Sequence, residues 1–106
     1  MITITVKKNN HSYVSFASKG HAGYAKAGYD IVCAAVSALV INAVNSIDAF
    51  TDDEIELIED DGFVSFRFLK PVSEKGTLLM DSLVLGLTEI EHNYKNRYLT
   101  VIVKEV

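Results

Sequence analysis

The sequence has a single cysteine and a single proline among its 106 residues, and it has no tryptophan. One cysteine cannot form an intrachain disulfide, so the cysteine count gives no indication of an oxidising compartment. The same count excludes a dithiol redox centre, which needs a second thiol. One cysteine and three scattered histidines also lack the spacing of a metal site, so we expect neither a metal nor another cofactor.

Charge and hydropathy limit the partners of the chain. Ten basic and fourteen acidic residues give a formal net charge of -4, and nucleic-acid binders are more often basic, so no direct nucleic-acid partner is expected. Residues 1–7 alternate like a strand and lack the charged and then apolar layout of a signal peptide. The longest nearly apolar stretch, residues 31–41, is too short to span a bilayer. We therefore expect a cytoplasmic protein without a membrane partner.

The residues that are present predict one domain covering residues 1–106. Apolar residues make up 49% of the chain, which excludes a disordered protein. Periodicity predicts strands at 2–7, 12–18, 54–59, 63–69 and 98–103, and helices at 31–50 and 74–92. The order ββαββαβ indicates an α+β two-layer sandwich, in which a mainly antiparallel sheet carries both helices on one face.

Turn and cap residues mark the ends of these elements. Asn9 and Asn10 predict a tight turn between the first two strands, because asparagine tolerates positive φ. Asp30 is a good N-cap for the first helix, and Ser73 is one for the second. The first helix is apolar on nearly every side, which one sheet cannot cover, so we expect a homodimer that uses this helix.

The lone cysteine lies where the first helix is predicted to begin. With Asp30 as N-cap, Cys33 is in the first turn, where unpaired N–H groups and the helix dipole favour the nucleophilic thiolate. His21, twelve residues earlier, is the natural base. The alternative is that Cys33 has no catalytic role and packs in the core as a small buried hydrophobic residue. His11 and His92 are expected to have no catalytic role, the first as a solvated turn residue.

Several neighbours of this pair are candidates to support it. Asp30 either only caps the helix or also orients His21. Ser37 lies one turn beyond Cys33 on the same helix face, and the backbone N–H groups around Cys33 are candidates for an oxyanion hole. The glycine-rich segment between the histidine and the cysteine predicts a mobile loop over the site. Its residues are Ala22, Gly23, Tyr24, Ala25, Lys26, Ala27 and Gly28.

Residues 20–37 combine these features in one motif. The motif reads Gly20-His21-Ala22, then Gly28-Tyr29-Asp30-Ile31-Val32-Cys33-Ala34, and then Ser37. It resembles the signature of the ribosomal-processing cysteine protease family called Prp. The His-to-Cys spacing, the aspartate three residues before the cysteine and the later pair Val44-Asn45 agree with that family. The resemblance extends over the whole chain in length and element order.

This resemblance implies a function. Members of the family are cysteine endopeptidases that remove a short N-terminal extension from a large-subunit ribosomal protein, number twenty-seven, and they cut between an aromatic pair and a small residue. If the roles known in the family are carried over to this sequence, Cys33 is the nucleophile and His21 is the base. Asp30 and Ser37 match positions that support this pair. Residues 22–28 match a flexible loop over the site. The family is also expected to be homodimeric. Tyr24, Tyr29 or aromatic residues of the sheet are candidates to line the aromatic pocket.

Two other functions remain open on the sequence alone. One is a non-catalytic ribosome-associated binding module, in which the acidic cluster at residues 52–61 would contact a basic ribosomal protein. The other is a thiol hydrolase that acts on small molecules.

Overall fold

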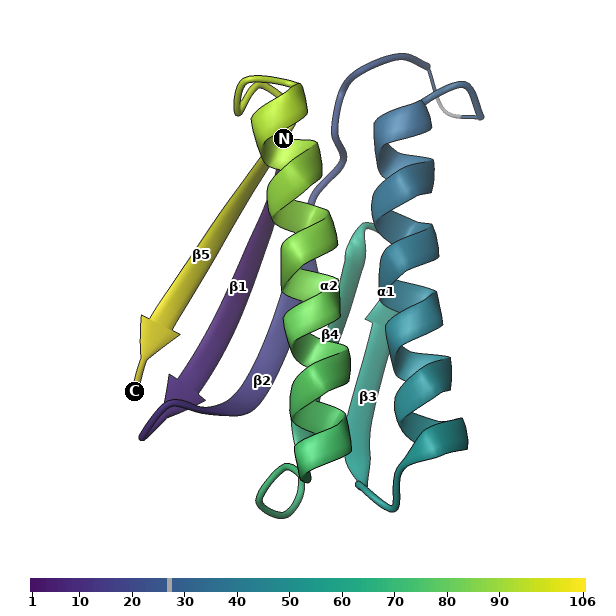
Figure 1. Ribbon diagram of the computed structural model, residues 1–106. Coiled ribbons are helices and arrows are strands. Elements are labelled where there is room, and N and C mark those ends of the chain that lie inside the picture. The colour runs from purple at the N-terminus through teal and green to yellow at the C-terminus, as the bar shows by residue number, and fades with distance from the viewer. Residues whose placement is uncertain (27) are drawn as a thin grey trace.

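The computed structural model describes residues 1–26 and 28–106, and it has the predicted order of elements (Figure 1). The strands are β1 (Ile2–Asn9), β2 (Ser12–Lys19), β3 (Ile55–Asp60), β4 (Phe63–Phe68) and β5 (Leu99–Glu105). The helices are α1 (Ile31–Phe50) and α2 (Glu74–Asn93). The predicted bounds of α1 are confirmed, and the other predicted ends differ by at most two residues.

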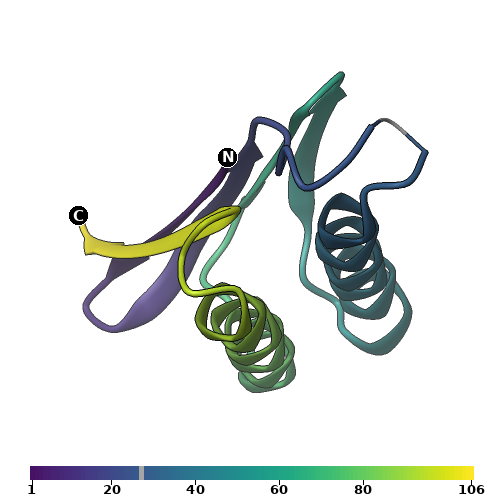
Figure 2. The ribbon, with the colours of Figure 1, turned by 90° about the horizontal axis from the view of Figure 1, so that it is seen from above.

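The strands form one sheet in the order β3-β4-β2-β1-β5. Neighbouring strands run antiparallel, except that β1 and β5 are parallel. Both helices cover the same face of this sheet, with α1 over the β3 and β4 side (Figures 1 and 2). The predicted two-layer α+β sandwich is therefore confirmed, and β3 is an edge strand beside α1.

The turn between β1 and β2 lies one residue later than predicted. Asn9 still pairs with Ser12, so the turn residues are Asn10 and His11, with φ values of 48° and 66°. Two central residues with positive φ match the right-handed twist of the flanking strands, which explains the shift. The expectation that His11 is a solvated turn residue is confirmed, since its side chain is exposed.

A β-bulge changes which residues of β2 are buried. The partner of Lys7 is Ser15 and that of Lys8 is Tyr13, so Val14 is an extra residue in the ladder. Tyr13 is consequently buried on the same side as Phe16, where simple alternation places Val14. The Tyr13 hydroxyl donates to Asp81 Oδ1 in α2 at 2.5 Å. Burial of the phenol and this carboxylate raise the pKa of Tyr13.

The hydrophobic core lies between the sheet and the two helices. In the sheet, the rings of Phe16 and Phe66 stack with centroids 5.2 Å apart. The helices contribute the buried residues Val32, Val36, Val40, Ala43 and Ile47 from α1, and Met80, Leu83 and Leu87 from α2. A Cβ at Gly86 would lie 2.9 Å from Leu39 Cδ1, so the glycine permits the close approach of α2 to α1.

Helix α1 as a whole is long and apolar enough to cross a membrane, judged by length and composition alone. Residues 31–41 are only part of this stretch, so the expectation based on them underestimated its length. Core helices of soluble proteins pass the same test, and α1 packs its buried face against the sheet and α2.

Asp30 caps the start of α1, as predicted. Its Oδ1 accepts the N–H groups of Val32 at 3.0 Å and Cys33 at 2.9 Å, and its Oδ2 accepts the N–H of Tyr24 at 3.1 Å. Partial burial acts to raise the pKa of Asp30. The hydrogen bonds from Cys33, Tyr24 and Val32, together with the adjacent Cys33 thiol, outweigh burial and hold this pKa below its usual range. The folded state therefore favours the charged carboxylate.

We predict that Asp30→Ala lowers the free energy of unfolding by about 1 kcal/mol at neutral pH, because it removes an N-cap. A lowered pKa means that the stabilisation is complete above the pKa of the unfolded state, about 3.9, and fades as the pH falls through the folded pKa. Urea unfolding between pH 3 and 7 should show the difference from wild type shrinking at the acid end.

Asp30→Asn is the matched control for charge, because it keeps an acceptor at the cap. Its stability relative to Asp30→Ala should change little over the same pH range. A wild-type advantage that is as large at pH 3 as at pH 7 would contradict a role for the charged cap.

Candidate active site

Cys33 lies in the first turn of α1 and is half-buried at the molecular surface. The N–H of Ala22 donates to Cys33 Sγ at 3.2 Å, across eleven residues of sequence. Ala22 itself is only 4% exposed, so this donor is fixed against the start of the helix. This contact was missed from the sequence, where Ala22 appeared only as a small loop residue.

His21 follows the end of β2 and packs against the turn between β3 and β4. The N–H of Gly20 donates to the carbonyl oxygen of Gly62 at 2.8 Å, which joins the two segments. The His21 Nε2 lies 2.8 Å from the place that a Cβ on Gly62 would take. Gly62 has φ of 65°, so the turn favours a glycine here, and a side chain at this position would require the His21 ring to shift.

The structure brings the four predicted site residues to one hollow of about 620 Å³. Its lining includes His21, Asp30, Cys33 and Ser37, together with Asp61 from the β3–β4 turn. No hydrogen bond joins the His21 ring to Cys33 Sγ in the described part of the chain. Catalytic hydrogen bonds are often long before substrate binds, so this geometry is compatible with a Cys-His dyad.

The interpretation of Asp30 as a helix cap is confirmed by its hydrogen bonds. Its carboxylate holds N–H groups from both the helix and the loop, and within residues 1–26 and 28–106 it has no hydrogen bond to His21. Asp30 therefore positions the backbone around Cys33. It reaches the loop through Tyr24.

The N–H groups around Cys33, which are the candidates for an oxyanion hole, already have acceptors in this structure. The N–H groups of Val32 and Cys33 donate to Asp30 Oδ1, and the N–H of Ala34 donates to the Asp30 carbonyl oxygen at 3.1 Å. These three groups satisfy the helix start, so they are not free to hold a developing oxyanion. The N–H observed at the reacting sulfur is that of Ala22.

An aromatic cluster anchors part of the predicted loop. The Tyr24 ring packs edge-on against Tyr94 and Tyr98, with centroids 5.8 and 5.2 Å apart. Tyr24 therefore points toward the end of α2 and not into the hollow beside Cys33. Tyr29 is 77% exposed, and neither tyrosine lines that hollow. Ala27, which belongs to the predicted mobile loop, lies outside the described residues.

The other titratable residues form no second centre. The exposed His11 lies 3.6 Å from a carboxylate oxygen of Glu105, and His92 lies in the last turn of α2. Among the residues that the structure describes, no three His, Cys, Asp or Glu side chains gather closely enough to hold a metal ion.

Comparison with known proteins identifies the family. The family model described as cysteine protease Prp matches residues 1–99. The ribosomal processing cysteine protease Prp of Bacillus subtilis (strain 168) is 35% identical over 103 residues, covering 91% of this chain and 92% of the relative. The corresponding protein of Staphylococcus aureus (strain Mu50) is 30% identical over 97 residues, covering 89% and 92% of the two chains.

A solved structure agrees with this assignment. The essential ribosomal processing protease Prp from S. aureus, in complex with a covalently linked product peptide, superimposes with a TM-score of 0.93 at 28% identity. The match covers 98% of this chain and 100% of that one. The fold, the lone cysteine at a helix start and these relatives lead to one conclusion: the chain belongs to the cysteine protease Prp family and is a cysteine protease.

Proposed function

We propose that this enzyme removes the N-terminal extension of a large-subunit ribosomal protein, number twenty-seven, by cutting between an aromatic pair and a small residue. The observation that carries the proposal is the placement of Cys33 Sγ at the start of α1, facing the Ala22 N–H, in the same hollow as His21. The relatives from B. subtilis and S. aureus are ribosomal processing proteases, which supports the substrate.

The proposed reaction is acyl transfer by a Cys-His pair. His21 takes the proton of Cys33, and the thiolate attacks the peptide carbonyl to form a tetrahedral intermediate. The protonated His21 gives its proton to the leaving amine, and water then releases the acyl-enzyme. The covalently linked product peptide in the S. aureus protein supports a covalent step of this kind.

Three parts of the site assist this reaction. The Ala22 N–H stabilises charge on the sulfur, and Asp30 fixes the helix start and the loop relative to each other. Ser37, one turn along the same face, borders the hollow where the substrate backbone would lie.

The proposed substrate agrees with the charge of the enzyme. Ribosomal proteins bind RNA and are generally basic, so an acidic enzyme attracts them electrostatically. The reaction belongs in the cytoplasm and needs no direct nucleic-acid contact and no membrane. Fractionation of cells that finds the protein in membranes or in purified RNA complexes would contradict this placement.

We predict that Cys33→Ala abolishes cleavage of a peptide containing two phenylalanines before an alanine, because the nucleophile is lost. The fold should persist, since the change removes one sulfur from a half-buried position. Intact-mass detection of the products measures cleavage, and circular dichroism measures folding. Cleavage by the folded variant would contradict the mechanism, and an unfolded variant would favour a structural cysteine.

The loop over the site is proposed to order when substrate binds. The described loop residues Gly23, Ala25, Lys26 and Gly28 are exposed. Ala22 and Tyr24 tether the first part of the loop to Cys33 and to the tyrosines near the end of α2. Ordering would exclude water and bring His21 toward Cys33.

Backbone hydrogen exchange tests this proposal. Exchange across Gly23, Tyr24, Ala25, Lys26 and Gly28 should slow when Cys33→Ala protein is saturated with the phenylalanine peptide. The Ala22 N–H should exchange more slowly than these without peptide, because it is hydrogen-bonded and buried. Equal exchange of the loop with and without peptide would show a rigid turn and no closure.

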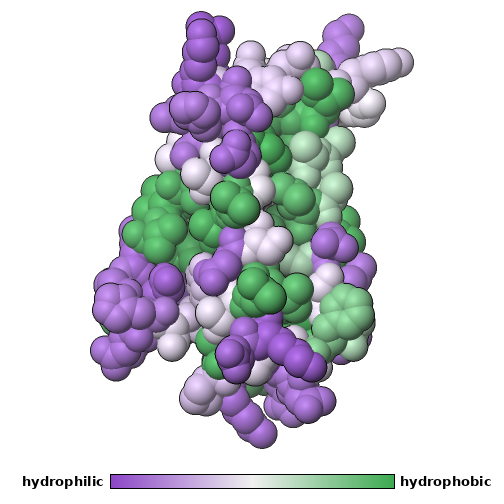
Figure 3. Space-filling model, in the orientation of Figure 1, coloured by the Kyte–Doolittle hydropathy of each residue, from purple (hydrophilic) through white to green (hydrophobic). Residues whose placement is uncertain are grey.

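A homodimer through α1 is also proposed. The outer face of α1 exposes Ile31, Ala34, Ala38 and Ile41, and Figure 3 shows apolar residues along this side of the molecule. Small and aliphatic side chains allow close contact between two copies of the helix in a symmetric interface.

We expect sedimentation at micromolar concentration to give a mass of twice 11.7 kDa. Ala38→Arg should convert this species to monomer, because it adds bulk and charge at the centre of the outer face. Leu85→Arg, on the exposed face of α2, is the matched control and should leave the dimer intact. A wild-type protein that is monomeric throughout would rule out this interface.

A further inference from the structure

Three tyrosines from distant parts of the chain form one closed cluster. The ring centroids of Tyr24 and Tyr98 are 5.2 Å apart, and those of the pairs Tyr24–Tyr94 and Tyr94–Tyr98 are 5.8 Å apart. All three pairs meet edge to face, with interplanar angles between 72° and 84°. This geometry is favourable, because the positive edge of one ring meets the negative face of the next. We name these three residues the tyrosine cluster.

Two members of the tyrosine cluster belong to the hydrogen-bonded connection between α2 and β5. Tyr94 is the C-cap of α2, and its N–H donates to the carbonyl oxygen of Ile90 at 3.2 Å. Tyr98 directly precedes β5, and its carbonyl oxygen accepts the N–H of Ile2 at 2.9 Å. Backbone hydrogen bonds therefore fix these two residues to the end of α2 and to the sheet.

The third member, Tyr24, belongs to the loop that leads to Cys33. It is the only aromatic residue in the sequence of residues 22–28. The described loop residues that follow it, Ala25, Lys26 and Gly28, are exposed. The loop runs past the end of α2 before it enters α1 (Figure 1), and the Tyr24 ring makes the contact there.

The backbone connects the Tyr24 ring to the surroundings of the thiol. The N–H of Tyr24 donates to Asp30 Oδ2 at 3.1 Å, and the same carboxylate accepts the N–H of Cys33 at 2.9 Å. Two residues before Tyr24, the N–H of Ala22 donates to Cys33 Sγ at 3.2 Å. Two residues span at most about 7 Å of chain. The ring contacts of Tyr24 therefore restrict where Ala22 lies relative to the sulfur.

We propose that Tyr94 and Tyr98 are positioning residues of this protease, which act through the Tyr24 ring to hold the Ala22 N–H at Cys33 Sγ. The described lining of the hollow that contains Cys33 includes none of the three rings, so the cluster acts from outside the site. This role rests on the proposed function, because it takes Cys33 as the nucleophile. One edge-to-face pair changes an equilibrium constant by about twofold to tenfold, and Tyr24 takes part in two such pairs.

Hydrogen exchange of the Ala22 N–H in the free enzyme measures this role directly. We expect Tyr24→Ala to speed this exchange roughly tenfold, because the loop opens more often once the ring contacts are lost. Tyr24→Phe keeps the ring and should change the exchange rate by less than about twofold. The N–H of the buried Val36 in α1 should exchange at the wild-type rate in both variants, which separates a local effect from a general loss of stability. Unchanged exchange at Ala22 in Tyr24→Ala would overturn the proposal.

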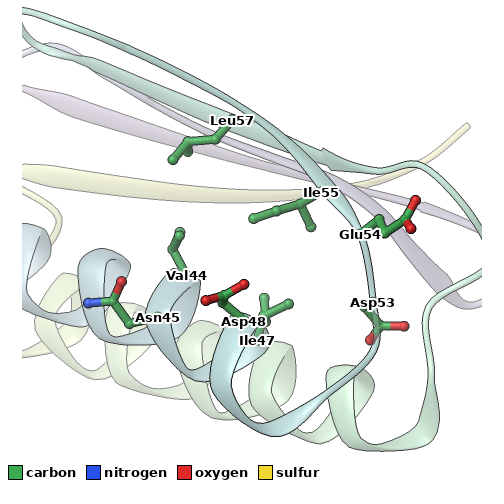
Figure 4. A pocket seen from close by; sticks show the side chains of 8 residues that line it. All are labelled: Val44, Asn45, Ile47, Asp48, Asp53, Glu54, Ile55 and Leu57. Carbon is green, nitrogen blue, oxygen red and sulfur yellow. The ribbon is translucent and has the colours of Figure 1, made fainter.

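Leu57 provides a matched control outside the loop. It lines the space between α1 and β3, where Leu57 and Val44 face each other (Figure 4). Leu57 is 39% exposed and Tyr24 is 41% exposed, so Leu57→Ala truncates a side chain of similar burial. Exchange of the Ala22 N–H in Leu57→Ala should stay within about twofold of wild type, since no described loop residue lines this space. Equal acceleration in Leu57→Ala and Tyr24→Ala would overturn the proposal.

A double-mutant cycle tests whether the remote tyrosines act through Tyr24. Tyr98→Ala alone should speed exchange of the Ala22 N–H severalfold, and Tyr98→Phe should restore the wild-type rate. In the Tyr24→Ala background, Tyr98→Ala should have little further effect, because the two changes remove the same contact. Tyr94→Ala repeats the cycle at the second contact and covers the case in which Tyr98→Ala does not fold. Effects that multiply in both cycles would overturn the proposal.

Cleavage kinetics separate this role from a substrate pocket and from the proposed function itself. With the phenylalanine peptide, Tyr24→Ala and Tyr98→Ala should lower kcat roughly tenfold and leave KM within about threefold of wild type. A loss confined to KM would make the tyrosine cluster a substrate contact and overturn the proposal. If the exchange of Ala22 responds as expected but the enzyme cuts no peptide, the cluster holds Ala22 and the proposed function fails. If the enzyme cuts the peptide but the exchange does not respond, the positioning role is wrong.

Discussion

The Asp30 carboxylate is the interaction on which the geometry of the site depends. One oxygen accepts two N–H groups from the first turn of α1, and the other accepts the N–H of Tyr24 from the preceding loop. The helix start and the loop are thereby fixed to a single charged group. Cys33 belongs to the helix start, and Ala22 belongs to the loop. Asp30 therefore helps to set the distance between the Ala22 N–H and the sulfur of Cys33. The negative charge of Asp30 thus serves to position the backbone near the thiol.

The sheet supplies the second constraint, because it brings remote segments to the helix start. The hydrogen bond from Gly20 to Gly62 joins the end of β2 to the β3–β4 turn, and it places His21 against that turn. The edge position of β3 then leaves the space beside α1 open toward Leu57. The hollow that contains His21 and Cys33, and the space beside it, are thus consequences of one strand order. In that order β3 is next to β4, and within residues 1–26 and 28–106 no further strand covers its other side.

Much of the fold could be predicted from the sequence because its signals are local. Asp30 marks the start of α1, and alternation or helical spacing identifies the remaining elements. The bulge at Val14 could not be predicted, since an unpaired residue in a strand leaves no compositional mark. In the site, Cys33 and His21 were found by chemistry and by resemblance. The contact of Ala22 with sulfur, the packing of Tyr24 and the lining by Leu57 depend on tertiary packing, which no local pattern encodes.

The space beside Gly62 has a consequence for how this family of sequences can vary. The imidazole of His21 occupies the volume that any side chain at position 62 would need, and the positive φ there already disfavours one. A change in a hairpin far from Cys33 in sequence would therefore shift the His21 ring, the proposed base, while leaving the core intact. A substitution at position 62 would therefore be expected to lower activity more than it lowers the stability of the fold. A side chain at position 62 would accordingly have two effects, a shift of the His21 ring and strain in the turn itself.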